Sequence, residues 1–259
     1  MLFKILKLLP AEFAHHLTIK ILSFDFSKNF FKIAKDNQIL KQFIWNLEFK
    51  NPIGLAAGFD KNGEAINSLL EFGFSFIEVG TVTPKGQSGN EKPRIFRLTK
   101  DKAIINHLGF NNQGMQKVVK RLKKRCENKN YSNGIVGINI GKNAESKLIS
   151  KDYVDCMKSL GKYSDYIVIN ISSPNTPGLR NLQNRQYLES LIIELKKIKN
   201  TDDAIKNKPL LIKIAPDLNQ EQKRDIALTS LAQGIDGIIV SNSTTSRPNT
   251  LLDNNRNEI

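Results

Sequence analysis

From about residue 47 onward, short apolar runs alternate with longer segments whose apolar positions recur with helical spacing. The runs occupy residues 53–57, 76–80, 136–140, 166–170, 210–214 and 237–241, and three of them end in Gly80, Asn170 and Ser241. Helical spacing is clearest at residues 113–126, 186–199 and 220–232. Because the runs are almost continuously apolar, the strands they predict must be covered on both faces, as in a parallel sheet. The pattern predicts repeated βα units.

The first 45 residues have a different pattern, so we expect two segments, residues 1–45 and 46–259. In the first segment, apolar side chains are interspersed with Lys4 and Lys7, and Pro10 opens a second helical pattern. The apolar positions are Leu2, Phe3, Leu6, Leu9, Phe13, Leu17 and Ile21. No apolar run approaches the ~20 residues that span a bilayer, and no secretion signal is recognisable. Such helices either lie at a membrane interface or pack as a pair on the domain.

The chain has a formal net charge of +14, which could favour nucleic acid, anionic lipid or anionic small molecules. The densest basic cluster is Lys117, Lys120, Arg121, Lys123, Lys124 and Arg125. We expect it to be a solvated helix face, because no exposed aromatic residues are interleaved as nucleic-acid binding would require.

Two cysteines and a pair of histidines show no pattern that indicates a metal site. Cys126 and Cys156 are far apart and have no nearby histidine, so neither a disulfide framework nor a zinc site is predicted. Cys156 falls in an apolar helical stretch and is expected in the core. His15 and His16 are consecutive and cannot face one metal from a helix, so we expect surface or interface positions.

Polar residues follow the predicted strands at their carboxyl ends. They are Asp60, Lys61, Thr81, Asn139, Asn170, Lys213, Ser241 and Asn242. In a (βα) barrel this is the catalytic face. The first strand does not lead into the GxGxxG pattern of a dinucleotide-binding fold, which argues against that alternative.

Seven segments resemble the dihydroorotate dehydrogenase family, in family order and along nearly the whole chain. They are NPIGLAAGFDKNG (51–63), EVGTVTP (78–84), KPRIFR (92–97), NHLGFNN (106–112), GINIGKN (137–143), NISSPNTPG (170–178) and KIAPD (213–217). The resemblance implies a (βα)8 barrel of the TIM type with an N-terminal helical extension. It also implies oxidation of (S)-dihydroorotate to orotate in pyrimidine biosynthesis, with FMN taking the hydride and a quinone reoxidising it.

By the same resemblance, Ser173 matches the catalytic base of the quinone-linked class. In the soluble class, the resemblance implies a cysteine at the matching position. A serine hydroxyl is a poor base unaided, and no histidine is nearby in sequence. We therefore expect the proton to pass on through water and Thr176. The alternative is that Ser172, Ser173 and Pro174 simply form a turn.

The resemblance also implies the two binding sets. Substrate contacts are expected from Lys61, Asn106, His107, Leu108, Gly109, Phe110, Asn170, Asn175, Asn242 and Ser243. Flavin contacts are expected from Ala57, Gly58, Phe59, Asp60, Lys61, Thr81, Asn139, Asn170, Lys213 and Ser241. Lys61 would face the substrate carboxylate, Gly58 would admit the flavin closely, and Lys213 would stabilise charge on the reduced flavin. Taken singly, each asparagine is a common turn former.

For this class the N-terminal helices resemble a lid that admits a membrane quinone and rests on an anionic membrane surface. The expected location is peripheral, on the cytoplasmic face of a bacterial inner membrane, and the expected state is a monomer.

The sequence departs from the family pattern in two ways. A barrel of this type has eight strands, and about six are predicted before the polar stretch 247–259. The family's glycine-rich segments for the FMN phosphate are also missing. We therefore expect a truncated chain, which leaves an impaired flavin-binding remnant or one part of a split enzyme as the alternative function. Smaller differences are Ser241 and Ser243, where threonine is common, and His107.

Overall fold

The computed structural model describes residues 6–24, 37–128, 134–176 and 179–258. At its centre is a six-stranded sheet in the order β12-β11-β10-β9-β4-β3, in which every neighbouring pair is parallel. The strands are β3 (Gly54–Leu55), β4 (Phe76–Val82), β9 (Ile135–Ile140), β10 (Tyr166–Asn170), β11 (Leu210–Ile214) and β12 (Gly237–Val240). All six predicted strands form, although β3 is shorter than predicted because the chain leaves the sheet after Leu55.

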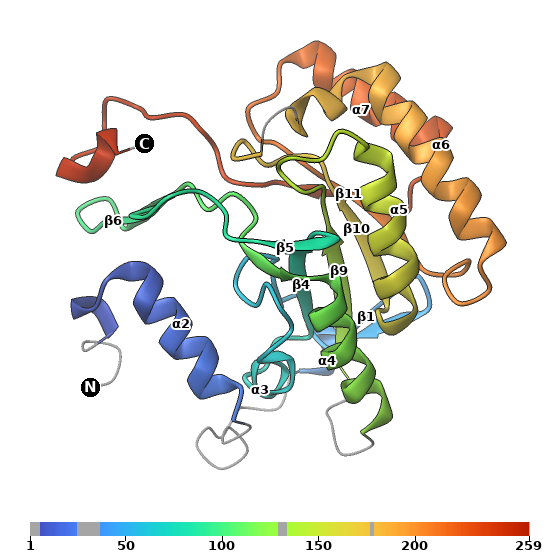
Figure 1. The fold of residues 1–259 in the computed structure, drawn as a ribbon, viewed down its shortest axis with the longest axis horizontal. Coiled ribbons are helices and arrows are strands. Elements are labelled where there is room, and N and C mark those ends of the chain that lie inside the picture. The colour runs from blue at the N-terminus through green and yellow to red at the C-terminus, as the bar shows by residue number, and fades with distance from the viewer. Residues whose placement is uncertain (1–5, 25–36, 129–133, 177–178, 259) are drawn as a thin grey trace.

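The helices between these strands lie mostly along one side of the sheet (Figure 1). They are α3 (Ile66–Glu71), α4 (Met115–Glu127), α5 (Ile149–Leu160), α6 (Arg185–Thr201) and α7 (Gln220–Ala232). Asn184 caps α6, and Asn219 forms a reciprocal capping box with Gln222 at the start of α7. The three predicted helical segments are confirmed, with ends displaced by no more than two residues.

Strand residues alternate between two apolar clusters, because successive side chains point to opposite faces of a sheet. Ile138, Ile169 and Ile212 are fully buried against the helices in the larger cluster, which also contains Cys156, as predicted. On the opposite face, Tyr166 and its neighbours form a smaller cluster. One face of the sheet is therefore covered by helices. The other face is concave, as the inner face of an incomplete barrel would be.

The amino-terminal end of that inner face is closed by a hairpin of β1 (Gln42–Ile44) and β2 (Leu47–Phe49). Trp45 in its turn packs on Tyr166 with ring centroids 6.4 Å apart, and its indole N–H donates to the Asp236 carbonyl at 3.2 Å. The expected boundary between residues 45 and 46 lies within this turn.

Helix α2 (Ala11–Leu22) lies beside α3 and apart from α5–α7 (Figure 1). Its last residue is held by Ser68, whose hydroxyl donates to the Leu22 carbonyl at 2.6 Å. The chain before it is held by Arg97, which donates to the Leu9 carbonyl at 2.7 Å. The predicted helical pattern after Pro10 is confirmed, whereas the apolar residues Leu2 and Phe3 lie outside the described residues.

Two further antiparallel strand pairs lie outside the central sheet. They are β5 (Lys85–Gln87) with β8 (Asn112–Gly114), and β6 (Ile95–Leu98) with β7 (Ala103–Asn106). The C-terminal segment, which ends in a short 3-10 turn (Asn254–Asn257), reaches back to this second pair, where Asn255 donates to the Arg97 carbonyl at 3.2 Å.

The basic cluster on α4 is largely a solvated face, as predicted. Val118 and Leu122 are buried, whereas the lysines of the cluster are exposed. Arg121 and Arg125 depart from the prediction, because each is partly buried and donates to a backbone carbonyl, at Asn62 and Gly134 respectively. In the described ranges, no helix is long and apolar enough to cross a bilayer.

Candidate active site

A cavity of about 950 Å³ lies between the carboxyl ends of the strands, helix α2 and the β6–β7 hairpin. It brings together most of the residues that the sequence predicts for substrate and flavin. Those that line it are Ala57, Gly58, Phe59, Lys61, Thr81, Asn106, Leu108, Gly109, Phe110, Asn170, Ser173, Asn175, Lys213, Asn242 and Ser243. Parallel strands end at one edge of their sheet, which explains why residues so distant in sequence converge.

The floor of the cavity is a network of buried amides and hydroxyls. The Thr81 hydroxyl donates to Asn139 Oδ1 at 2.6 Å, and Asn170 Nδ2 donates to both, at 2.8 and 3.1 Å. Asn170 Oδ1 in turn accepts from the backbone N–H and the hydroxyl of Ser172. The network determines which way each amide points, because every donor faces an acceptor.

Glu78 extends this network and is a site residue that sequence reasoning missed. Its Oε1 accepts from Asn139 Nδ2 at 2.7 Å. Burial raises the pKa of Glu78, while the Lys213 charge and the hydrogen bonds from Asn139 and Tyr166 oppose that rise. An acidic residue inside an otherwise apolar strand was the available signal.

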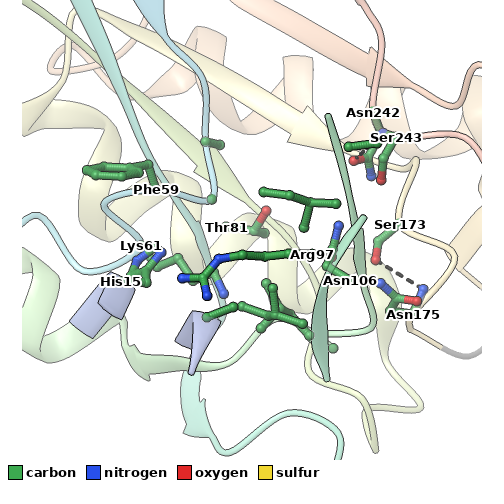
Figure 2. A pocket seen from close by; sticks show the side chains of 18 of the residues that line it. His15, Phe59, Lys61, Thr81, Arg97, Asn106, Ser173, Asn175, Asn242 and Ser243 are labelled. Carbon is green, nitrogen blue, oxygen red and sulfur yellow. Dashed lines mark hydrogen bonds between the residues drawn. The ribbon is translucent and has the colours of Figure 1, made fainter. Parts of the chain in front are cut away.

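Ser173 and Asn175 lie on the loop after β10, at one end of the cavity (Figure 2). The Ser173 hydroxyl oxygen accepts from the Asn175 backbone N–H at 3.2 Å, and the side chain is almost fully buried. Thr176 is also buried, and within the described ranges its hydroxyl has no hydrogen-bond partner. Two hydroxyls on this loop are therefore buried, and the Thr176 hydroxyl can still accept or donate a hydrogen bond.

Lys61 lies on the side of the cavity nearer to α2, close to His15 (Figure 2). Its ammonium group donates to Asn111 Oδ1. Burial lowers the pKa of Lys61 to about 8, with a further contribution from the Arg94 charge, whereas Glu12 raises it. Near neutral pH, Lys61 is thus mostly charged, but it is poised to lose its proton under mildly alkaline conditions.

His15 occupies an interface position, one of the two alternatives that the sequence predicts, and it also lines the cavity, which was not predicted. Its ring lies 5.2 Å from the Phe59 ring, and burial, followed by the Lys61 charge, lowers its pKa. His16 lies at the surface, as predicted, 3.5 Å from Glu12.

Five predicted residues are not among those that line the cavity: Asp60, His107, Asn139, Thr176 and Ser241. Asp60 holds the turn before α3, since its carboxylate accepts from the N–H groups of Glu64 and Ala65 at 2.8 Å each. The Ser241 hydroxyl donates to the Asn242 carbonyl at 2.9 Å. Asn139 lies beneath the cavity and acts on it through Thr81.

Gly58 shows that the inner part of the cavity suits a flat ring. It has a φ of +112°, a conformation that residues with a side chain rarely adopt, and a Cβ at this position would meet nothing within 4 Å. The backbone here is therefore open to close approach. Together with the amides of the floor, it fits a planar group that carries alternating carbonyl and N–H edges.

The outer part of the cavity contains residues to which the sequence analysis assigned no contact. Its walls include Ala11, Ala14 and Thr18 of α2, together with Leu98 and Arg97 of the hairpin. The Arg97 guanidinium caps carbonyls of residues 6–9. Only the docking of α2 on the hairpin creates this wall, so the local sequence held no signal for it.

The fold and the site together define an α/β protein of the (βα) barrel class, with its ligand cavity at the carboxyl ends of the parallel strands. The chain belongs to the dihydroorotate dehydrogenase family, whose sequence profile it matches over residues 39–258. Members of this family depend on a flavin.

The curated relatives are quinone-dependent members of the family. The chain is 44% identical over 250 residues to dihydroorotate dehydrogenase (quinone) of Rhodospirillum rubrum, covering 96% of this chain and 66% of that protein. It is 46% identical to the mitochondrial enzyme of Oryza sativa, covering 93% of this chain and 56% of that protein. The chain thus spans about two thirds or less of these relatives.

A solved structure supports the fold throughout the chain. The crystal structure of DHODH from Eimeria tenella in complex with ferulenol superposes with a TM-score of 0.90 at 40% identity. The match covers 96% of this chain and 71% of that chain. The fold described above is therefore shared with that structure.

Proposed function

We propose that this chain carries the catalytic portion of a quinone-dependent dihydroorotate dehydrogenase. It would oxidise (S)-dihydroorotate to orotate in pyrimidine biosynthesis, with FMN as hydride acceptor and a quinone as final electron acceptor. The observation that carries the proposal is the convergence of Ser173, Lys61 and Lys213 with the amides on one cavity. The relatives are named as quinone enzymes, which is the class that Ser173 indicates by resemblance.

Oxidation of dihydroorotate removes a proton and a hydride from adjacent carbons, so a base and an electron acceptor are both needed. Bound FMN would supply the hydride-accepting ring. In this proposal the Ser173 oxygen takes the proton and passes it on through water and Thr176. In support, the buried Thr176 hydroxyl has no hydrogen-bond partner among the described residues and can still donate and accept.

Substrate recognition is assigned to the remaining cavity groups. Lys61 supplies the positive charge opposite the substrate carboxylate, and a charge-assisted hydrogen bond of this kind is stronger than a neutral one. Asn106, Asn170, Asn175 and Asn242 can each donate and accept, which suits the amide-like edges of a dihydropyrimidine.

Cofactor binding is assigned to the inner part of the cavity. Gly58 allows the flavin ring to approach the backbone, and Lys213 places a positive charge where electron density collects on reduction. Glu78 is buried near Lys213 but does not reach the cavity. Asn139 and Thr81 lie between them: Thr81 lines the cavity, and Asn139 lies beneath Thr81.

We further propose that residues 1–45 form the quinone-access segment of a (βα)8 barrel, of which residues 46–259 provide about six units. Helix α2 forms the wall of the outer cavity, and Phe13, Ile21 and Phe24 are 56%, 46% and 58% exposed on or beside it. Such apolar exposure suits a membrane interface, and the net charge of +14 suits an anionic one. The corresponding location is peripheral, on the cytoplasmic face of a bacterial inner membrane, and the corresponding state is a monomer.

One observation favours a second candidate function, a flavin-binding remnant or one part of a split enzyme. Strand β12 is at the edge of the sheet, and Val240 on it is 79% exposed. An edge with exposed apolar side chains is a template for pairing with further strands. A version extended by the C-terminal segment of a relative would separate the two candidates, because only an incomplete enzyme gains turnover from the extension.

The proposed function is tested by purifying the chain with FMN and adding dihydroorotate without oxygen. Stoichiometric FMN and bleaching of its visible absorbance are expected, followed by recovery of the absorbance on addition of a quinone analogue. Bound FMN that dihydroorotate does not bleach, in both the chain and its extended version, would contradict the proposal.

Gly58→Ala is expected to weaken FMN binding by at least about tenfold, because an alanine disfavours the positive φ of this cavity-lining residue and so moves the backbone that the flavin would approach. Fluorescence quenching in an FMN titration measures the effect. Gly234→Ala is the matched control, since Gly234 also has a positive φ but lies at the end of α7. Equal losses in both variants would show that Gly58 acts only through general stability.

A further inference from the structure

A buried ion pair joins helix α2 to the loop before the β6–β7 hairpin. Arg94 Nη2 lies 2.6 Å from Glu12 Oε1, and Arg94 Nε donates to both carboxylate oxygens at 3.2 Å. The side chains are only 6% and 14% exposed. Although burial opposes it, the hydrogen bond and charge of Arg94 lower the pKa of Glu12, so the pair is ionic.

The other side of the same guanidinium binds the loop of residues 88–90, which contacts the 106–110 segment assigned to the substrate. Arg94 Nη1 donates to the carbonyls of Ser88 and Asn90 at 2.6 and 2.7 Å. Asn90 then donates through Nδ2 to the His107 carbonyl at 3.0 Å, and the His107 N–H donates to the Arg94 carbonyl at 2.8 Å. Arg94 therefore contacts α2 and, through Asn90, the 106–110 segment.

The pair also lies beside Lys61. Charged or titratable groups around Lys61 come from α2 (Glu12, His15 and His16), from the preceding loop (Arg94) and from its own turn (Asp60 and Glu64). The β8 side supplies the neutral acceptor Asn111. Of these, Arg94 and Glu12 act on Lys61 in opposite directions.

We propose that Glu12 and Arg94 are positioning residues that couple the docking of α2, at the outer end of the cavity, to the substrate end. Two interactions transmit this coupling. Arg94 is hydrogen-bonded, directly and through Asn90, to the 106–110 segment, and the two charges of the pair lie beside Lys61. This inference rests on the proposed function, because it assigns Lys61 and residues 106–110 to the substrate.

The ion pair predicts the direction in which each of two substitutions shifts the pH dependence of orotate binding. Orotate binds to charged Lys61, so affinity is present at low pH and is lost as pH rises through the Lys61 pKa of about 8. Glu12→Gln removes the charge that raises this pKa, so the alkaline loss moves to lower pH. Arg94→Gln removes a repelling charge, so the loss moves to higher pH. A merely structural role would not produce opposite shifts.

Calorimetric titration of the FMN-loaded chain with orotate, from about pH 6.5 to about pH 9.5, measures these shifts. Lys92→Gln is the matched control, since Lys92 is 65% exposed and lies 3.6 Å from the same carboxylate. It is expected to leave the profile unchanged. Arg94→Lys, which keeps the charge, is expected to restore the wild-type position. Shifts of the same sign in Glu12→Gln and Arg94→Gln would overturn the electrostatic coupling.

Backbone hydrogen exchange tests the mechanical coupling without any ligand. Glu12→Gln is expected to accelerate exchange on the order of tenfold in both α2 and residues 103–110, because one buried charged hydrogen bond is lost. Lys92→Gln should accelerate neither. Acceleration confined to α2 would overturn the inference. A wild-type chain that shows the exchange coupling but binds no orotate at any pH would instead contradict the proposed function.

Discussion

Ser173→Ala is expected to slow the reduction of bound FMN by dihydroorotate by about 10²- to 10⁴-fold, the usual contribution of a positioned base. FMN content should be unchanged, because the Ser173 hydroxyl contacts only the Asn175 N–H among the described residues. Anaerobic stopped-flow spectroscopy at the flavin absorbance measures the rate. Ser173 lines the cavity but is only 4% exposed, so few other groups can take over the role of the lost base.

Two further variants separate catalysis by Ser173 from packing of its loop. Ser173→Cys introduces a thiol, which ionises more readily than a hydroxyl, and should retain more activity than the alanine variant, particularly at higher pH. Thr176→Val keeps the shape of Thr176 but removes its free hydroxyl, so it should slow reduction by a smaller factor. If Ser173→Ala reduced FMN at the wild-type rate, Ser173 would have no part in the proton transfer.

Lys61→Met is expected to weaken orotate binding by about 30- to 100-fold near neutral pH, because a charged hydrogen bond contributes about 2–3 kcal/mol. The difference from wild type should shrink above pH 8, where the lysine itself loses its proton as burial lowers its pKa to about 8. Calorimetric titrations at neutral and alkaline pH give both numbers.

Lys102→Met is the matched control for Lys61→Met. Lys102 also lines the cavity, but it is exposed in the turn of the β6–β7 hairpin. Its replacement should change orotate affinity by less than about threefold, since exposed charges are well screened. An equal loss in both lysine variants would mean that the cavity attracts orotate by general charge and not through Lys61.

Much of the fold was predictable because parallel strands buried on both faces need continuous apolar sequence. The run at residues 166–170 is the clearest example, and all five residues of β10 are buried. The first strand was predicted too long, because Ala57 and its neighbours serve the cavity instead of the sheet. Sequence periodicity does not distinguish these two uses of an apolar residue.

The site residues likewise include some that the sequence predicted and some that it did not. Ser173, Lys61 and Lys213 were predictable because each belongs to a family motif at a strand end or in the loop that follows, and all three line the cavity. The contact of His15 and Arg97 with the cavity was not predicted, since both reach the cavity only through the docking of α2 and the hairpin. No local pattern records that docking.

The sequence by itself determined the repeated βα units, the family and the polar groups at the strand tips, because these depend on short-range patterns. Tertiary structure alone decided which of those groups share a cavity. It turned Asp60 toward helix α3, set Asn139 beneath Thr81, and brought Glu12 and Arg94 together across 82 positions of the chain. Contacts between residues so far apart depend on how whole elements pack, which no local stretch of sequence specifies.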